Sequence, residues 1–260
     1  MVKHLPILLL PLLAHGQFGA FNDQAFMTAR AATTSASSLL TGLVAYWRFD
    51  EAATSNGQTW TNADGTANNW GTNHNAVTSA TGIITNCVGI TTTGRGIEVP
   101  KSIDSRAAST AWTLAFWFKD EGTTDSGEAM VSMQGAPEND WSINAGASNK
   151  PHFLTWDSSN VSTDLAGNTA IVCCGTTWTF IVCGFDGTNT FINVNNGTRA
   201  TATPTDNRRG GSNLVWLNYG NFSFNWAGEI DEAGYWQRWL TTAEQTTLYN
   251  SGSGITYPFQ

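Results

Sequence analysis

The sequence predicts an all-β protein, a sandwich of two antiparallel sheets with one short helix near the C-terminus. From residue 43 onward, short runs of alternating apolar residues are separated by clusters of Gly, Asn, Asp, Ser and Thr. Asp186-Gly187 and Asn196-Gly197 are turn sequences typical of hairpins. So many short strands in one chain favour two curved sheets packed face to face, a jelly roll.

Each predicted strand is an apolar-alternating run bounded by turn-forming residues. The strands are predicted at residues 43–49, 82–90, 95–99, 112–118, 128–134, 140–145, 152–157, 169–174, 178–185, 190–195, 198–203, 214–219 and 226–238. A helix is predicted at about 242–250, because Thr241 and Glu244 have the spacing of a capping box. Gly252 is placed to supply the left-handed residue that ends this helix.

The composition excludes two broad classes of protein. Apolar residues make up 41% of the chain and charged residues only 12%. This composition excludes an intrinsically disordered protein. The net charge is −8 and no cluster of Lys and Arg is present, so the chain lacks the cations that bind nucleic-acid phosphates. The isolated pair Arg208-Arg209 is interpreted as a solvated turn.

Four segments carry a family resemblance, and they occur in the family's order. They are the first strand GLVAYWRFDE (residues 42–51), the strand WTLAFWF (112–118), the hairpin from Trp178 to Gly197, and the run GEIDEAGYWQRWLTTAE (228–244). Together they resemble laminin-G-like domains of the concanavalin A-like lectin/glucanase superfamily over about residues 41–258. The resemblance implies a concanavalin A-like jelly roll and, since those domains are mostly binding modules, a binding function.

The four cysteines do not form a disulfide framework. Cys173 and Cys174 are neighbours, so on a strand they point to opposite faces, and Cys183 is too far along the predicted hairpin to reach either. We interpret the cysteines as free buried thiols that pack as small apolar groups. The alternative is one disulfide that involves Cys87.

The chain divides into an N-terminal segment, residues 1–40, and a domain, residues 41–260. Met1 to Gly16 has the pattern of a signal peptide, and its apolar run is too short to span a bilayer. Pro6 and Pro11 instead suit an extended apolar arm, which is ordered only when it docks onto another molecule. The Ala/Thr/Ser tract at residues 31–38 is a tether by composition.

These alternatives lead to two functions. A retained arm, a tether and a binding-type sandwich fit a protein mounted through its arm on other subunits of a virion, such as a phage capsid or tail, for decoration and attachment. A cleaved signal peptide fits a secreted bacterial lectin-like protein. We expect the first, with glycans as possible ligands on the exposed surface.

A third function is glycoside hydrolysis, because Glu229-Ile230-Asp231 is similar to the active-site run of laminarinase-like hydrolases. Retaining hydrolysis needs two carboxyl groups about 5 Å apart. The second glutamate of that run is missing, since Ala233 and Gly234 stand there, and strand alternation points Glu232 away from Asp231. We therefore expect no catalytic residues and no enzymatic activity.

The family resemblance also implies a structural Ca²⁺ ion at the rim of the sandwich. Its ligands are expected from the end of the first strand, a loop and the last strand, which gives Asp50, Asp64 and Asp231. Ca²⁺ takes six to eight oxygen ligands, many of them carbonyls. The alternative is that Asp50 and Asp231 cap turns or accept backbone amides.

The tryptophans fall into two groups by their neighbours. Those that alternate with apolar residues are predicted to lie in the core: Trp47, Trp112, Trp117 and Trp178. Those among Asn, Thr, Ser and Asp are candidates for stacking on a sugar ring: Trp60, Trp70, Trp141 and Trp156. The alternative for this second group is that each ring anchors its own loop.

Overall fold

The computed structural model describes residues 38–51, 57, 59–65, 71–74, 78–90, 96–100, 110–120, 129–135, 138–146, 149–157, 159–170, 177–204, 213–216 and 227–259. The predicted N-terminal arm, Trp70, Cys173 and Cys174 lie outside this described part of the chain.

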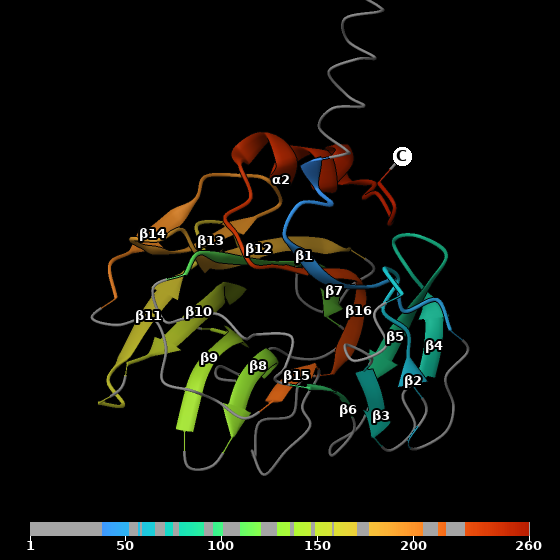
Figure 1. Cartoon of the computed structure of the whole chain (residues 1–260), viewed down its shortest axis with the longest axis horizontal. Coiled ribbons are helices and arrows are strands. Elements are labelled where there is room, and N and C mark those ends of the chain that lie inside the picture. Colours follow the sequence, from blue (N-terminus) through green and yellow to red (C-terminus); the bar gives the residue numbers. More distant parts are fainter. Residues whose placement is uncertain are drawn as a thin grey trace, which may run out of the picture.

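Two antiparallel sheets face each other (Figure 1). Sheet A runs in the order β14 (Ala200–Ala202), β13 (Thr190–Val194), β12 (Thr179–Phe185), β7 (Trp112–Asp120), β16 (Gly228–Trp236), β5 (Asn86–Ile90) and β4 (Thr78–Thr81), with β1 (Leu43–Trp47) also paired to β16. Sheet B runs β11 (Ser162–Ala166), β10 (Pro151–Trp156), β9 (Glu138–Ala145), β8 (Ala129–Gly135), β15 (Asn213–Trp216), β6 (Gly96–Pro100), β3 (Gly71–His74) and β2 (Thr59–Trp60). The predicted sandwich is therefore confirmed.

The main core lies between the two sheets and is rich in aromatic rings. Trp112 of sheet A meets Trp141 and Phe153 of sheet B, with ring centroids 5.1 and 5.9 Å away. All three side chains are at most 1% exposed. Such aromatic contacts between sheets bury large apolar areas and fix how the sheets are stacked.

A second apolar layer covers the face of sheet A that points away from sheet B. Helix α2 (Thr242–Tyr249) and the C-terminal tail lie on this face (Figure 1). Trp117 of β7 stacks on Tyr249 of the helix, with ring centroids 5.7 Å apart and planes 11° apart. Because both faces of sheet A are covered, β12, β13 and β16 are buried along their whole length.

The helix begins as predicted and ends earlier. Thr241 and Glu244 form the capping box, each binding the other's backbone N–H. The left-handed residue that ends α2 is Asn250 (φ 45°), two residues before the predicted Gly252, which itself lies in the turn that follows. Asparagine tolerates this conformation because its side chain bonds locally, here to the Gly254 carbonyl (2.8 Å). No helix in the described part is long and apolar enough to cross a membrane.

Most predicted strands are present, but four polar ones were missed: β2, β3, β4 and β11. Their sequences, such as GTNH in β3 and STDLA in β11, lack apolar alternation, so pairing with neighbouring strands is what makes them extended. The predicted strand at 169–174 lies partly outside the described residues, and its described positions, 169 and 170, are not in a strand. Cys87 and Cys183 are buried free thiols, which confirms that interpretation for these two residues.

Candidate functional site

The first and last strands meet at one rim of the sandwich. β1 pairs with the second half of β16, Trp47 lying opposite Ala233, so Asp50 at the end of β1 comes to the region of Asp231. Asp50 Oδ1 accepts the Asn86 backbone N–H (3.1 Å), and Asp231 Oδ2 accepts that of Ile84 (3.1 Å). The two carboxylates thus hold the same turn, residues 82–86. Both aspartates accept backbone amides, which is the role given above as the alternative to calcium binding.

A bulge in β16 places a third carboxylate at this rim. Between Asp231 and Gly234 the pairing with β7 shifts register, and Glu232 takes a left-handed conformation (φ 47°). The prediction that Glu232 points away from Asp231 is wrong, because the extra residue interrupts the alternation of the strand. Glu232 is 3% exposed, and the Tyr46 and Thr256 hydroxyls lie near its carboxylate.

Burial governs the protonation of this acidic group. Burial, together with repulsion from Glu232, raises the pKa of Asp231 to about 9, although the Ile84 and Glu232 amides oppose the shift. Burial also raises the pKa of Glu232 to about 8, with the Tyr46 and Thr256 hydroxyls nearby favouring the charged form. Both carboxyl groups therefore hold protons to a large extent at neutral pH.

The predicted third calcium ligand is Asp64. Asp64 is in the turn after β2, where its backbone N–H faces Asn62 Oδ1 at 3.4 Å. Within the described ranges, no group of three or more His, Cys, Asp or Glu side chains is close enough together to hold a metal ion. The fold therefore brings Asp50 and Asp231 to one turn, with Glu232 beside them.

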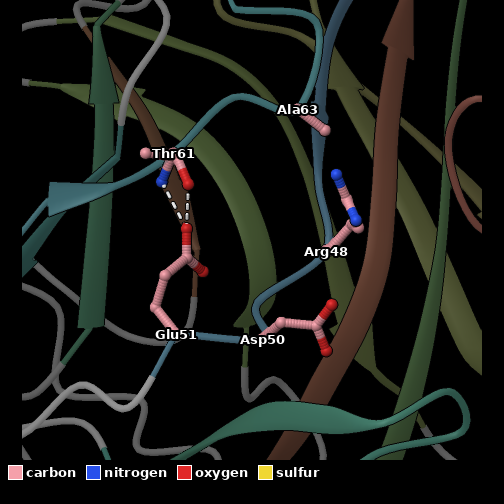
Figure 2. A pocket seen from close by; sticks show the side chains of 5 residues that line it. All are labelled: Arg48, Asp50, Glu51, Thr61 and Ala63. Carbon is pink, nitrogen blue, oxygen red and sulfur yellow. Dashed lines mark hydrogen bonds between the residues drawn. The ribbon is translucent and has the colours of Figure 1, made fainter.

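A pocket of about 240 Å³ opens beside Asp50. Its lining residues are Arg48, Asp50, Glu51, Thr61 and Ala63. Figure 2 shows the Glu51 carboxylate turned toward Thr61, whose backbone N–H (2.9 Å) and hydroxyl it accepts. This contact ties the end of β1 to the segment that follows β2 and leaves Arg48 and Asp50 on the opposite wall.

Two of the candidate sugar-binding tryptophans are core residues. Trp60 on β2 packs edge-on against Phe49 (5.6 Å between ring centroids), and Trp141 on β9 packs against Trp112. Both are 0% exposed, so the prediction that their rings are available at the surface is wrong. Their polar neighbours belong to the other face of each strand, because side chains alternate.

Trp156 is the candidate ring that reaches the surface of the described structure. On β10, Pro151, Phe153 and Thr155 are buried, while His152, Leu154 and Trp156 alternate with them and are partly exposed. These three form a row on the face of sheet B that points away from sheet A, which we call the outer face. Small polar residues of the adjacent strands pair with the row: Ser142 and Asn144 on β9, and Ser162 and Asp164 on β11.

The polar end of this row is held in a fixed arrangement. His152 Nδ1 lies 2.8 Å from Asp164 Oδ1, and the two side chains are 21% and 53% exposed. Gly146 makes room for the imidazole, since a Cβ there would lie 1.8 Å from His152 Cδ2. The glycine is therefore required where the β9–β10 turn passes under the histidine ring.

The residues suggested for hydrolysis are engaged in other contacts. Glu229 is 5% exposed, and its carboxylate forms an ion pair with Lys119 of the neighbouring strand. The Lys119 ammonium in turn lies over the Trp178 ring, 5.3 Å from its centroid. Asp231 is fully buried and accepts two backbone N–H groups.

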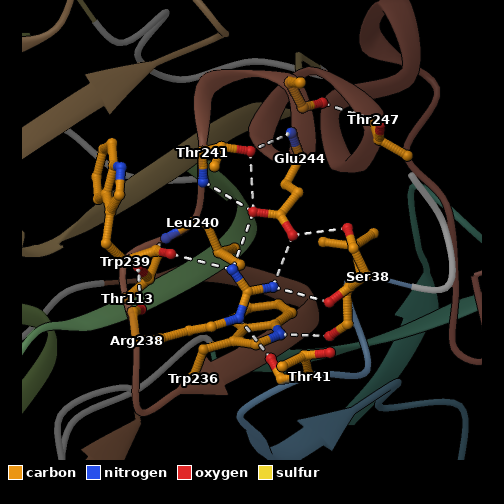
Figure 3. Close-up of polar contacts among 12 residues, drawn as sticks. Ser38, Thr41, Thr113, Trp236, Arg238, Trp239, Leu240, Thr241, Glu244 and Thr247 are labelled. Atoms are coloured by element: carbon orange, nitrogen blue, oxygen red, sulfur yellow. Dashed lines mark hydrogen bonds and ion pairs between the residues drawn. The ribbon is translucent and has the colours of Figure 1, made fainter. Parts of the chain in front are cut away.

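A cluster around Arg238, which the sequence did not predict, fixes the first described residues (Figure 3). The guanidinium pairs with both oxygens of Glu244 (2.7 and 2.9 Å) and donates to the carbonyls of Ser38 and Thr41. Trp236 Nε1 donates to the carbonyl between them, that of Leu39 (2.7 Å). We call the cluster of Ser38, Leu39, Thr41, Trp236, Arg238 and Glu244 the clamp. The clamp joins residues about 200 positions apart, so no local sequence pattern predicts it.

Comparisons with solved structures agree on the fold. Domain 4 of AbnA, an extracellular arabinanase from Geobacillus stearothermophilus solved with arabinotriose, has TM-score 0.60 and 18% identity over 82% of this chain and 98% of that one. The binding domain of Paraclostridial Mosquitocidal Protein 1 has TM-score 0.64 and 15% identity over 81% and 52%. Trypanosoma rangeli sialidase with sialic acid has TM-score 0.64 and 11% identity over 91% and 40%.

A search of curated protein sequences gives no significant match. A family profile does match, over residues 91–244, and its description is the concanavalin A-like lectin/glucanases superfamily, Laminin G type 3. The matched region runs from just before β6 through β16 to the capping box of α2. The chain therefore belongs to the laminin-G-like family of the concanavalin A-like lectin/glucanase superfamily.

Proposed function

We propose that this protein is a non-enzymatic glycan-binding module whose ligand site is the outer face of sheet B around β10. The observation that carries the proposal is the outward, partly exposed indole of Trp156. An indole stacks on the apolar face of a sugar ring, while nearby hydroxyls, amides and carboxylates bind the sugar hydroxyls. The neighbouring residues Ser162, Asp164 and Asn144 supply these polar groups.

Proteins of the same fold support this class of ligand. The arabinanase domain was solved with arabinotriose and the sialidase with sialic acid, so sugars are ligands of those two proteins. At such low sequence identity, the similarity of these proteins to this chain is evidence for a shared fold only. The proposed ligand class therefore rests on the residues of the outer face.

The alternative of glycoside hydrolysis finds less support in the contacts of its candidate residues. A nucleophile or acid must be free to approach the glycosidic bond. Glu229 is instead buried in an ion pair with Lys119, and Asp231 is fully buried against the turn 82–86.

We further propose that the domain is mounted on a virion surface through residues 1–40, for decoration and attachment. The clamp supports this arrangement, since it holds Ser38 beside α2, on the opposite side of the sandwich from sheet B (Figures 1 and 3). A chain attached through its N-terminal segment would then present the outer face of sheet B away from its carrier. The alternative is a secreted lectin-like protein, and intact-mass spectrometry of the native protein decides between them, because secretion predicts a mass that begins at Gln17.

A Ca²⁺ ion at the rim is also proposed, with Asp50, Asp231 and Glu232 as the protein carboxylates. The burial of the Asp231 and Glu232 carboxylates beside Asp50 supports this proposal, because a bound cation would offset the cost of charging them. The ion would supply charge neutralisation and join the ends of β1 and β16 to the turn 82–86. The three carboxylates would have to draw closer together to share it.

A glycan array with matched variants tests the binding function. We expect Trp156→Ala to weaken binding by roughly ten- to hundredfold, the scale of losing one large apolar contact. Leu40→Ala is the control, because this side chain is 45% exposed and lies between the clamp residues Leu39 and Thr41. Equal binding by both variants would contradict the site, and steady release of reducing sugars that stops in Glu229→Gln would establish a hydrolase.

A further inference from the structure

We propose that Asp164, held in place by His152, makes the outer face selective for uncharged glycans. This inference rests on the proposed function, since it specifies the ligand class of the same surface. Asp164 would be the residue that determines specificity, and His152 a residue that positions it.

The position of Asp164 places it within reach of a sugar stacked on Trp156. On β10 and β11, Trp156 pairs with Ser162 and Leu154 pairs with Asp164, so Asp164 is the diagonal neighbour of the indole. Diagonal neighbours on one face of an antiparallel pair are about 7–8 Å apart. A pyranose or furanose ring on the indole therefore extends its hydroxyls toward the carboxylate.

The chemistry of the carboxylate selects among sugars. Ionised Asp accepts hydrogen bonds and donates none, so it binds neighbouring sugar hydroxyls. It repels a sulfate or carboxylate on the sugar, and such a repulsive contact contributes to specificity. With 53% of its side chain exposed, Asp164 is accessible to a ligand.

Lys150 directly precedes β10 and His152 is bonded to Asp164, but the strands around Asp164 contain no Lys or Arg. The sequences of β8, β9, β10 and β11 contain no Lys or Arg, and the whole chain carries a net charge of −8. An anionic glycan stacked on Trp156 would meet the Asp164 carboxylate and the neutral side chain of Ser162.

His152 fixes the direction of the carboxylate. The imidazole is held from below by the backbone at Gly146 and from the side by β10, and its Nδ1 bonds Asp164 Oδ1 at 2.8 Å. This contact restrains the Asp164 carboxylate, which lowers the entropy lost when a sugar binds.

The test uses matched polysaccharides in gel affinity electrophoresis of the full chain: laminarin, arabinan and galactan, each in neutral and chemically sulfated form. We expect wild type to bind the neutral form of at least one polymer, and its sulfated form at least tenfold more weakly. Asp164→Asn should keep the neutral binding within a few fold and reduce the discrimination to less than threefold. Asp186→Asn is the control for net charge, because Asp186 lies in the β12–β13 turn of the other sheet.

His152 is tested through rescue. His152→Ala should reduce both affinity and discrimination, whereas His152→Asn, which can donate a similar bond to Asp164, should restore them. Equal binding of neutral and sulfated forms by wild type, or unchanged discrimination in Asp164→Asn, would overturn the selectivity while leaving glycan binding in place. Binding to no neutral polymer, with no effect of Trp156→Ala, would instead overturn the proposed function.

Discussion

Arg238 and Glu244 form a two-point ion pair that joins the last strand, the helix cap and the first described residues. The two N–O distances are 2.7 and 2.9 Å, and the Glu244 side chain is 8% exposed. Glu244 also accepts the Ser38 hydroxyl (2.7 Å) and the Thr241 backbone N–H (2.8 Å). One carboxylate therefore serves both as helix cap and as the centre of the clamp.

Removing the arginine should destabilise the domain without changing its ligand face. We expect Arg238→Ala to lower the free energy of unfolding by about 1.5–3 kcal/mol, the scale of hydrogen bonds to a charged group. Urea unfolding measures this change, with Thr247→Ala, a partly exposed position of α2 whose hydroxyl donates to the Ala243 carbonyl within the helix, as the control. Faster hydrogen exchange at Leu39 to Thr41 should accompany it, and a stability equal to wild type would show that the clamp contributes nothing.

Glu244 should contribute stability that is lost in acid. Burial opposes its charge, but bonds from Arg238, Ser38 and Thr241 outweigh burial and lower the pKa of Glu244 to about 2. Because the folded pKa lies below the ordinary value, this stabilisation is present above about pH 4.5 and is lost as the pH falls toward 2. Glu244→Gln should therefore flatten the acid limb of a plot of melting temperature against pH. An acid limb identical to wild type would contradict this assignment.

Asp231 and Glu232 should give the opposite pH dependence in metal-free buffer. Their folded pKa values are raised to about 9 and 8, so the folded state holds more protons than the unfolded state above about pH 4. Stability is then highest near pH 4 with respect to these groups and falls as the pH rises through 9. Asp231→Asn and Glu232→Gln should each reduce this decline, measured by thermal unfolding in a chelator.

Calcium should reverse that decline if it binds at the rim. At pH 8 we expect the melting temperature to rise with free Ca²⁺, because a bound ion stabilises the folded state by mass action. Glu232→Gln should remove the response, and Asp64→Asn should keep it. Elemental analysis without bound calcium, together with a melting temperature that chelation does not change, would rule the ion out.

Substitution of a buried tryptophan should cost much more stability than substitution of a partly exposed one. Trp141 is fully buried against Trp112 and Phe153, so Trp141→Ala should lower the free energy of unfolding by about 3–5 kcal/mol. Trp156→Ala should change stability by less than about 1 kcal/mol, since its ring is on the outer face. Similar losses for the two variants in urea unfolding would contradict this difference.

The sequence by itself determined the features that depend on neighbouring residues. The alternation of apolar residues predicted the strands of sheet A other than β4, Asp186-Gly187 predicted the β12–β13 turn, and Thr241 with Glu244 predicted the start of α2. Each of these is a backbone preference or a short-range hydrogen bond, so it is encoded within a few residues.

Only the tertiary structure decided which polar and aromatic residues meet at the candidate sites. The bulge at Glu232 follows from how β16 accommodates both β7 and β1, and it turns a carboxylate from its expected face to the rim. Trp60 and Trp141 have polar neighbours, yet they face inward because the pairing of their strands, rather than local composition, sets the buried face. The pairing of His152 with Asp164 likewise depends on the register of β10 and β11, which the polar sequence of β11 does not reveal.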